Sequence, residues 1–321
     1  MRALVSASAL ALVAASPDAF AAEWETGVSG FYHLGLAVTD SDSQDGVGVL
    51  RDGEFHITGE LTTDNGLTFE AVIEVEAHTS DDQIDKNYGA VSGAFGSLKF
   101  GGDDAAIATY ANGVIGAPGS HIGYVDHNGL TAAADDVAAI AGGENAVGVH
   151  YDTPNFMGFQ AGFSYIPDLG ADGAGDVNNP SFSNDDYWSV AGAYEGEFSG
   201  VAIGVSAGYA DENGPDNDVW GVGGFIGASG FTLAGGYQDA GAAYTDGAAA
   251  GETFYVGAAY ETGPWVFAGG YSNNNATDTD VAGAWITYSL APGLAATGGV
   301  EYGDDGVNED IGAIAYMSLR F

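Results

Sequence analysis

The chain has 321 residues, of which 46% are hydrophobic, and its 53 glycines and 17 tyrosines favour β structure over the composition of an average globular enzyme. Five basic residues against 45 acidic ones give a formal net charge of -40, which excludes nucleic acid as a partner because phosphate binding needs Lys and Arg. The absence of cysteine excludes disulfides and thiolate chemistry.

The N-terminal residues 1–22 have the pattern of a secretory signal peptide. One basic residue, Arg2, precedes an apolar core from Ala3 to Ala15, and small residues follow as far as Ala22. The apolar core is too short to span a membrane, and no run of about eighteen apolar residues occurs elsewhere. We therefore expect a cleaved signal peptide at 1–22, a mature chain of 23–321 and no transmembrane helix.

From Trp24 onward, short stretches carry an apolar residue at every second position. In the stretch 67–78 the odd positions are apolar, while the even positions include Glu70, Glu74 and Glu76. A strand places such alternate residues on opposite faces. Seven short connections interleave with eight long ones, among them 39–49 and 79–86. The pattern predicts an all-β fold, a transmembrane 16-stranded antiparallel up-and-down β-barrel.

The stretch from Gly101 to Asn145 interrupts this regular series. A long loop without secondary structure is uncommon in a compact chain unless it is functional. Its apolar residues, such as Ile107, Tyr110 and Ile122, make it too hydrophobic to extend into water, and its many Gly and Ala residues make it a poor strand. We expect residues of about 102–145 to fold into the lumen as a constriction loop.

Aromatic residues recur at equivalent places in the predicted strands. Rings with a polar tip favour the interface between membrane and water. Five strands that run from a short turn toward a long loop end with a tyrosine on their apolar face. Three of these strands also begin near another aromatic residue. The first belt is Tyr165, Tyr209, Tyr237, Tyr271 and Tyr302, and the second is Phe159, Phe231 and Trp265.

Carboxylates dominate the face that the pattern turns inward. A constriction lined by one sign of charge selects ions, and low-dielectric walls focus its field. The candidate pore-lining residues are Glu54, His56, Glu60, Glu70, Glu74, Glu76 and Lys99, and those of the constriction loop are Asp103, Asp104, Asp126, Asp135, Asp136 and Glu144. We expect a channel that prefers cations; the alternative is that these carboxylates are solvated and leave selectivity unchanged.

Other candidate sites give weaker signals. The acidic loops, for example at Asp304 and Asp305, could hold Ca²⁺, although no segment has EF-hand spacing and a surface screened by counterions explains them equally. The six histidines include no pair with zinc spacing. The segment 204–208 fits G-x-S-x-G, but alternation continues straight through Ser206, whereas a nucleophile elbow turns from strand into helix. We expect no enzyme and no cofactor; structural calcium in the acidic loops is the alternative that the sequence leaves open.

Three segments resemble a known family. The chain ends with alternating apolar residues and a terminal Phe321, which looks like the closing strand of a Gram-negative outer-membrane protein. The segments 149–159 and 95–101 are similar to the strands that flank the constriction loop of general diffusion porins. The resemblance is to the Gram-negative general diffusion porin family, alphaproteobacterial type, and covers the whole chain.

The resemblance implies a homotrimer of 16-stranded barrels in the outer membrane, in contact with its lipid and passing small hydrophilic solutes and cations. Such porins place clustered arginines opposite the acidic loop, whereas the mature chain keeps only Arg51, Lys86, Lys99 and Arg320. The alternatives are a barrel enzyme and a secreted or surface acidic β-protein with a structural or adhesive role.

Overall fold

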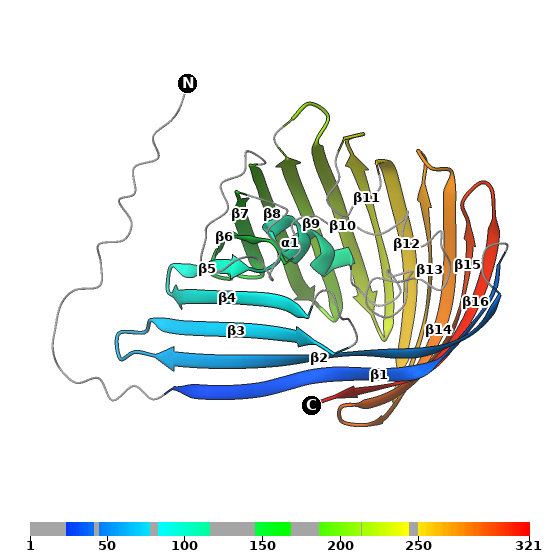
Figure 1. Cartoon of the computed structure of the whole chain (residues 1–321), viewed down its shortest axis with the longest axis horizontal. Coiled ribbons are helices and arrows are strands. Elements are labelled where there is room, and N and C mark those ends of the chain that lie inside the picture. Colours follow the sequence, from blue (N-terminus) through cyan, green and yellow to red (C-terminus); the bar gives the residue numbers. More distant parts are fainter. Residues whose placement is uncertain are drawn as a thin grey trace.

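The computed structural model describes residues 24–41, 45–77, 83–115, 145–167, 186–212, 214–243 and 250–321. Within these ranges the chain forms sixteen β-strands and one α-helix (Figure 1). Each strand pairs with its sequence neighbours, and the first strand pairs with the last, so that the sheet closes into a barrel. The predicted 16-stranded antiparallel up-and-down barrel is confirmed, whereas the predicted signal peptide at 1–22 lies outside the described residues.

The elements follow one another along the chain without a crossover. The first half contains β1 (Glu25–Ser41), β2 (Gly46–Thr62), β3 (Thr68–Glu76), β4 (Ile84–Gly93), β5 (Gly96–Gly102), α1 (Ala106–Ile115), β6 (Val147–Asp152), β7 (Phe159–Ile166) and β8 (Tyr187–Phe198). The second half contains β9 (Val201–Glu212), β10 (Asp218–Ala228), β11 (Phe231–Ala240), β12 (Gly251–Thr262), β13 (Trp265–Asn274), β14 (Thr279–Ala291), β15 (Leu294–Asp304) and β16 (Glu309–Arg320).

The short connections are tight turns, as predicted. Between β8 and β9, Ser199 and Gly200 both have positive φ, 54° and 80°. Ser229 and Gly230 repeat this pattern between β10 and β11, with φ of 54° and 83°. Two central turn residues with positive φ are the requirement of a type I′ turn, whose twist matches that of the flanking strands.

Two of the predicted long connections are wrong in extent. The predicted loop 39–49 is mostly strand, because β1 continues to Ser41 and β2 starts at Gly46, where the sequence GVGV pairs with the end of β1. The predicted loop 79–86 is also too long, since β4 starts at Ile84. Lys86 therefore belongs to the barrel wall and not to a loop.

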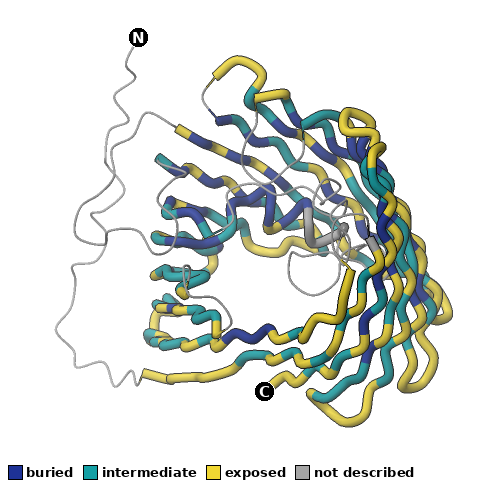
Figure 2. Tube along the Cα trace, turned by 45° about the vertical axis from the view of Figure 1, so that its right-hand side comes forward, coloured by how far each residue is buried: buried dark blue, intermediate teal, exposed yellow. Residues whose placement is uncertain are grey.

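Side chains alternate between the outside and the inside of the barrel. In β12, Val256 is 52% exposed on the outer face, while its neighbour Tyr255 on the inner face is 8% exposed. The same alternation of exposed and covered residues recurs along the other strands (Figure 2). The outer face is thus largely apolar, as a barrel in contact with lipid requires.

Aromatic pairs form two belts on the outer face, as predicted. Near the long loops, the ring of Tyr209 lies 5.3 Å from that of Trp188, and Tyr237 lies 5.3 Å from Trp220. Near the short turns, the predicted Phe159, Phe231 and Trp265 pair with tyrosines that the sequence pattern missed. Their partners are Tyr194 at 4.5 Å, Tyr260 at 4.2 Å and Tyr288 at 4.5 Å.

The barrel closes through the two ends of the chain. β16 pairs with β1 from Arg320 opposite Phe31, and Gly30 and Phe321 exchange two backbone hydrogen bonds of 3.0 and 3.1 Å. The ring of Phe321 lies 5.5 Å from that of Phe55 on the outer face. Within the described ranges, no helix has the length and hydropathy that crossing a membrane requires.

Candidate functional site: the lumenal wall and its helix

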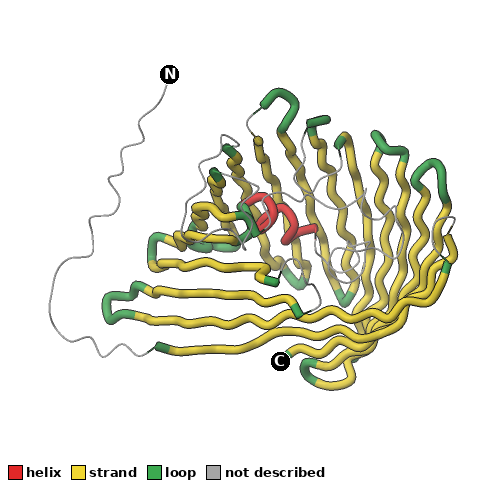
Figure 3. Tube along the Cα trace, in the orientation of Figure 1, coloured by secondary structure: helices red, strands yellow, loops and turns green. Residues whose placement is uncertain are grey.

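Helix α1 packs against the inner face of the barrel, over β7 to β10 (Figure 3). Its residue Ile107 is fully buried among inward-facing residues of these strands. Gly208 permits this approach, because a Cβ there would stand 2.8 Å from Cγ1 of Ile107. The beginning of the predicted constriction loop thus lies in the lumen. Residues 116–144, with the predicted Asp126, Asp135, Asp136 and Glu144, lie outside the described residues.

Hydrogen bonds fix the first half of the helix to the wall. The backbone N–H of Ala106 donates to Oγ of Ser164 at 2.8 Å, and the hydroxyl of Tyr110 donates to Oδ1 of Asp152 at 2.8 Å. Ser206 donates from Oγ to the carbonyl oxygen of Ala111 at 3.3 Å. Ser206 lies within the continuous strand β9, so its G-x-S-x-G surroundings serve to anchor a helix and form no strand-to-helix elbow.

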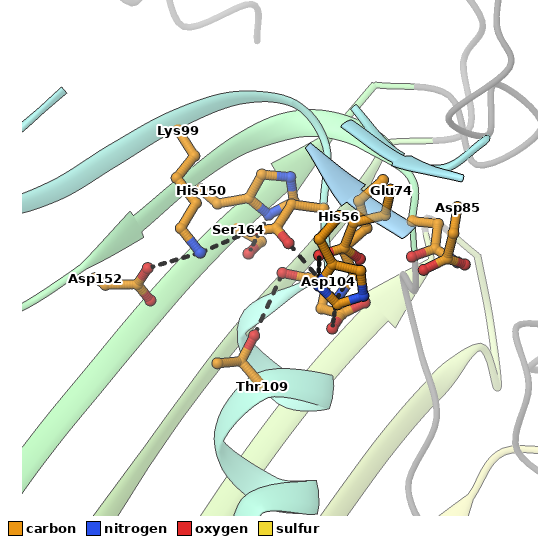
Figure 4. Close-up of polar contacts among 12 residues, drawn as sticks. His56, Glu74, Asp85, Lys99, Asp104, Thr109, His150, Asp152 and Ser164 are labelled. Atoms are coloured by element: carbon orange, nitrogen blue, oxygen red, sulfur yellow. Dashed lines mark hydrogen bonds and ion pairs between the residues drawn. The ribbon is translucent and has the colours of Figure 1, made fainter. Parts of the chain in front are cut away.

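Two lysines neutralise the carboxylates that follow β5, and Figure 4 shows one of them, Lys99, beside Asp152. Nζ of Lys99 lies 2.6 Å from Oδ2 of Asp103 and 3.4 Å from Oδ2 of Asp152. Nζ of Lys86 lies 2.7 Å from Oδ2 of Asp104 and 3.9 Å from Oδ1 of Asp103. The predicted Asp103 and Asp104 are therefore in the lumen, but their charge is largely compensated by ion pairs.

Sequence reasoning missed Lys86 as a site residue because it was assigned to a loop. The pairing of β3 with β4 shifts between Ile73 and Val75, and this irregularity hides the parity of the following strand. The alternation of β5 predicted the inward direction of Lys99 correctly, as its contacts show.

The remaining predicted pore-lining residues share the inner face of β2 and β3. Glu60 stands opposite Glu70, Glu54 opposite Glu76, and His56 opposite Glu74 in the strand register. The imidazole of His56 lies between two carboxylates, with Nε2 3.1 Å from Oε1 of Glu54 and Nδ1 3.6 Å from Oε1 of Glu74. The structure thus brings all of the predicted wall glutamates to one side of the lumen.

Further carboxylates face the lumen from the strands at the closing seam. Asp52, Glu301 and Asp310 are 5%, 4% and 6% exposed, and the sequence pattern did not select them as pore-lining. Their strand parity would have identified them, although Asp310 falls within the predicted long loop 303–310. Nδ1 of His33 lies 3.3 Å from Oδ2 of Asp52.

Basic residues are scarce on the inner face. Arg320 faces inward at the short-turn end, beside a cavity that His33 and His56 also line. Arg51 stands opposite the exposed Leu34 in the register and shares its outward face. In the ranges that the structure describes, the inner face of β7 to β15 carries no lysine or arginine. The arginine wall of related porins, doubtful from the sequence, is absent from this part.

The one group among the described residues whose side chains could hold a metal ion is Glu54, His56 and Glu74, on the lumenal wall. The acidic loops proposed for calcium are described only in part, because Asp168, Asp172 and Asp176 lie outside the described residues. Calcium binding by these loops stays a prediction.

A closed barrel with an apolar belted exterior, a charged inner wall and a helix in its lumen is a membrane channel of the diffusion type. The family model for Gram-negative porins matches residues 6–308. The chain belongs to the Gram-negative porin family. It is an outer-membrane diffusion channel, and membership in this family favours a channel over an enzyme.

Solved porin structures share the fold. A double mutant of the Rh. blastica porin superposes with a TM-score of 0.67 at 17% identity, covering 92% of this chain and 100% of that chain. A triple mutant of the Rhodopseudomonas blastica porin gives 0.66 at 17% identity with the same coverage. A structure described as showing asymmetric conductivity of engineered proteins gives 0.67 at 18% identity, again covering 92% and 100%. No curated protein matches the chain.

Proposed function

We propose that this porin prefers cations over anions among the small hydrophilic solutes that it passes. The observation that carries the proposal is the imbalance of charge on the inner wall. Its two described lysines are engaged by Asp103, Asp104 and Asp152. Glu54, Glu60, Glu70, Glu74 and Glu76 add negative charge on β2 and β3 alone.

The size of the effect follows from Coulomb's law. A unit charge about 4 Å from a permeating ion contributes about 1 kcal/mol in bulk water and about 4 kcal/mol at an effective dielectric constant near 20. Every 1.4 kcal/mol is about a tenfold change in equilibrium concentration. A few uncompensated carboxylates on the inner wall of the barrel are therefore enough to favour cations over anions.

The zero-current potential across a planar bilayer with a salt gradient tests this proposal. If cations permeate faster than anions, the side of the bilayer with the lower salt concentration becomes positive. Raising the ionic strength should shrink the preference, because screening shortens the reach of the wall charges. A potential of the opposite sign, or one near zero at low salt, would refute cation preference.

We also propose that residues 1–22 are removed on export and that the mature chain assembles as a homotrimer. Membership in the Gram-negative porin family supports both parts of this proposal. Mass spectrometry of the purified protein tests the cleavage, and chemical crosslinking in detergent tests the trimer. A mature chain that starts at Met1, or crosslinking that stops at the monomer, would contradict the respective part.

A further inference from the structure

The cluster of Glu54, His56 and Glu74 is built by the strand ladder itself. Glu54 and His56 are two residues apart on β2, so both point into the lumen, and Glu74 is the cross-strand partner of His56 on β3. One potential ligand atom from each side chain lies within 4.8 Å of the others. Ligands held by paired strands are positioned more precisely than ligands on loops.

The imidazole of His56 has a carboxylate oxygen at each nitrogen. A neutral imidazole carries one N–H, so one of its nitrogens directs a lone pair at a carboxylate. A cation between that nitrogen and the oxygen turns this repulsion into coordination. Zinc bonds of about 2.1 Å at a tetrahedral angle place two ligand atoms about 3.4 Å apart. The contact of 3.1 Å between Nε2 of His56 and Oε1 of Glu54 is close to this separation, and one ligand oxygen of Glu74 lies within 4.8 Å of the other two ligand atoms.

The surroundings allow an ion to enter and be retained. The side chains of Glu54 and Glu74 are 11% and 14% exposed, and that of His56 is 32% exposed, so the cluster is shielded yet open to the lumen. His56 also borders a cavity of about 420 Å³ with Ser29 and Phe31, which leaves room for water ligands.

The nearest positive charge, that of Lys86, leaves the cluster available to a metal ion. Nζ of Lys86 approaches Oε2 of Glu74 at 4.0 Å, while its closer partner is Asp104 at 2.7 Å. Lys86 therefore holds the oxygen of Glu74 that does not face His56. Two carboxylates and a neutral imidazole carry two negative charges, which a divalent ion balances.

We propose that Glu54, His56 and Glu74 bind a divalent transition-metal ion of the zinc type on the lumenal wall, and that its occupancy lowers the cation conductance of the pore. One imidazole nitrogen and two carboxylates suit zinc, whereas calcium takes six to eight oxygen ligands. The binding itself does not depend on the ion preference proposed above, because it is measured directly on the protein.

Equilibrium dialysis of the full refolded protein against Zn²⁺, in detergent and without chelating buffer, tests the proposal. One zinc ion per chain is expected, with at least about tenfold weaker binding of Ca²⁺. Mutating a residue that only hydrogen-bonds to a metal ligand weakens metal binding by about 10–100-fold. His56→Ala removes a ligand itself, so it should weaken zinc binding by at least about a hundredfold. The variant Glu74→Gln provides the same test should His56→Ala fail to fold.

His33→Ala is the matched control. His33 is also lumenal, but its ring meets one carboxylate, that of Asp52 at 3.3 Å, and the hydroxyl of Ser318 at 3.0 Å. Zinc binding that His33→Ala retains and His56→Ala loses supports the site, as does a zinc-dependent drop in single-channel conductance in the wild type but not in His56→Ala. Absence of zinc binding, equal loss in both histidine variants, or binding unchanged in both His56→Ala and Glu74→Gln overturns it.

Discussion

Replacing Lys99 with methionine should strengthen cation preference, because this lysine neutralises two lumenal carboxylates at once. Its Nζ lies 2.6 Å from Asp103 and 3.4 Å from Asp152, and it also lies over the ring of Tyr88 at 5.4 Å. Methionine keeps the length of the side chain and removes its charge. A unit charge about 4 Å from a permeating ion is worth about 1 kcal/mol in water. The change favours cations and disfavours anions by about 1 kcal/mol each, so the ratio of cation to anion permeability should rise about thirtyfold.

The assay is the zero-current potential of Lys99→Met in a planar bilayer, with Arg51→Met as the control. Arg51→Met removes the same charge from the outward face, so it should leave the potential unchanged. The double variant Lys99→Met with Asp103→Asn restores the wild-type net charge and should return the potential most of the way. A shift toward anions in Lys99→Met, or an equal shift in the Arg51 control, would show that the inner-wall ion pairs do not set selectivity.

Folding of the Lys99 variant needs its own check. Asp103 is 5% exposed, and breaking a buried ion pair by removing one partner costs about 3–5 kcal/mol when the remaining charge is fully shielded. Asp103 keeps Lys86 within 3.9 Å, so the loss should fall below that range. Heat-modifiable migration on a detergent gel shows whether the barrel has formed.

The remaining predictions concern the helix, the two faces of the wall and one loop. Gly208→Val should displace helix α1, because the valine side chain would clash with Ile107 of the helix at a cost of about 1–3 kcal/mol. Faster proteolysis of the helix together with altered conductance would show the displacement. Val300→Arg on the outer face should destabilise the barrel by about 2–4 kcal/mol, measured by urea unfolding from lipid vesicles. Thr287→Arg on the inner face should not have this effect, and equal losses of stability in the two variants would contradict the assignment of faces. In the loop after β15, hydrogen bonds from the side chain and backbone of Asn308 hold the pKa of Asp305 below its usual range, so the turn should persist at neutral pH and be lost only as the pH falls through that lowered pKa. Asn308→Ala should raise this pKa in an NMR titration, and an unchanged value would refute the cause.

The barrel was predictable because its period of two is a direct consequence of strand geometry. Glu54 and Phe55 could be assigned to opposite faces from sequence alone, and the structure confirms both. The closing strand was equally clear, since Phe321 ends an alternating run. Glycine-rich ends such as 46–49 were misjudged, because only pairing with a partner strand shows that such residues are extended.

The lumenal helix was not predicted, although a signal for it exists. Ile107, Tyr110 and Ala111 have helical spacing of three and four residues, and all three are buried against the wall. The many Gly and Ala residues of the surrounding segment obscured that spacing. The contacts between His56 and Glu74 could not be read from the sequence, because they depend on the register between two strands and not on spacing along one.

The joining of the first and last strands has a consequence for biogenesis. His33 and Ser318 meet at this seam although they are 285 residues apart in the sequence. Pairings of this kind form slowly, since the entropy of closing the loop is lost before the contacts are gained. The barrel therefore cannot be completed while the polypeptide is still being delivered, because β1 lacks its partner until β16 has arrived.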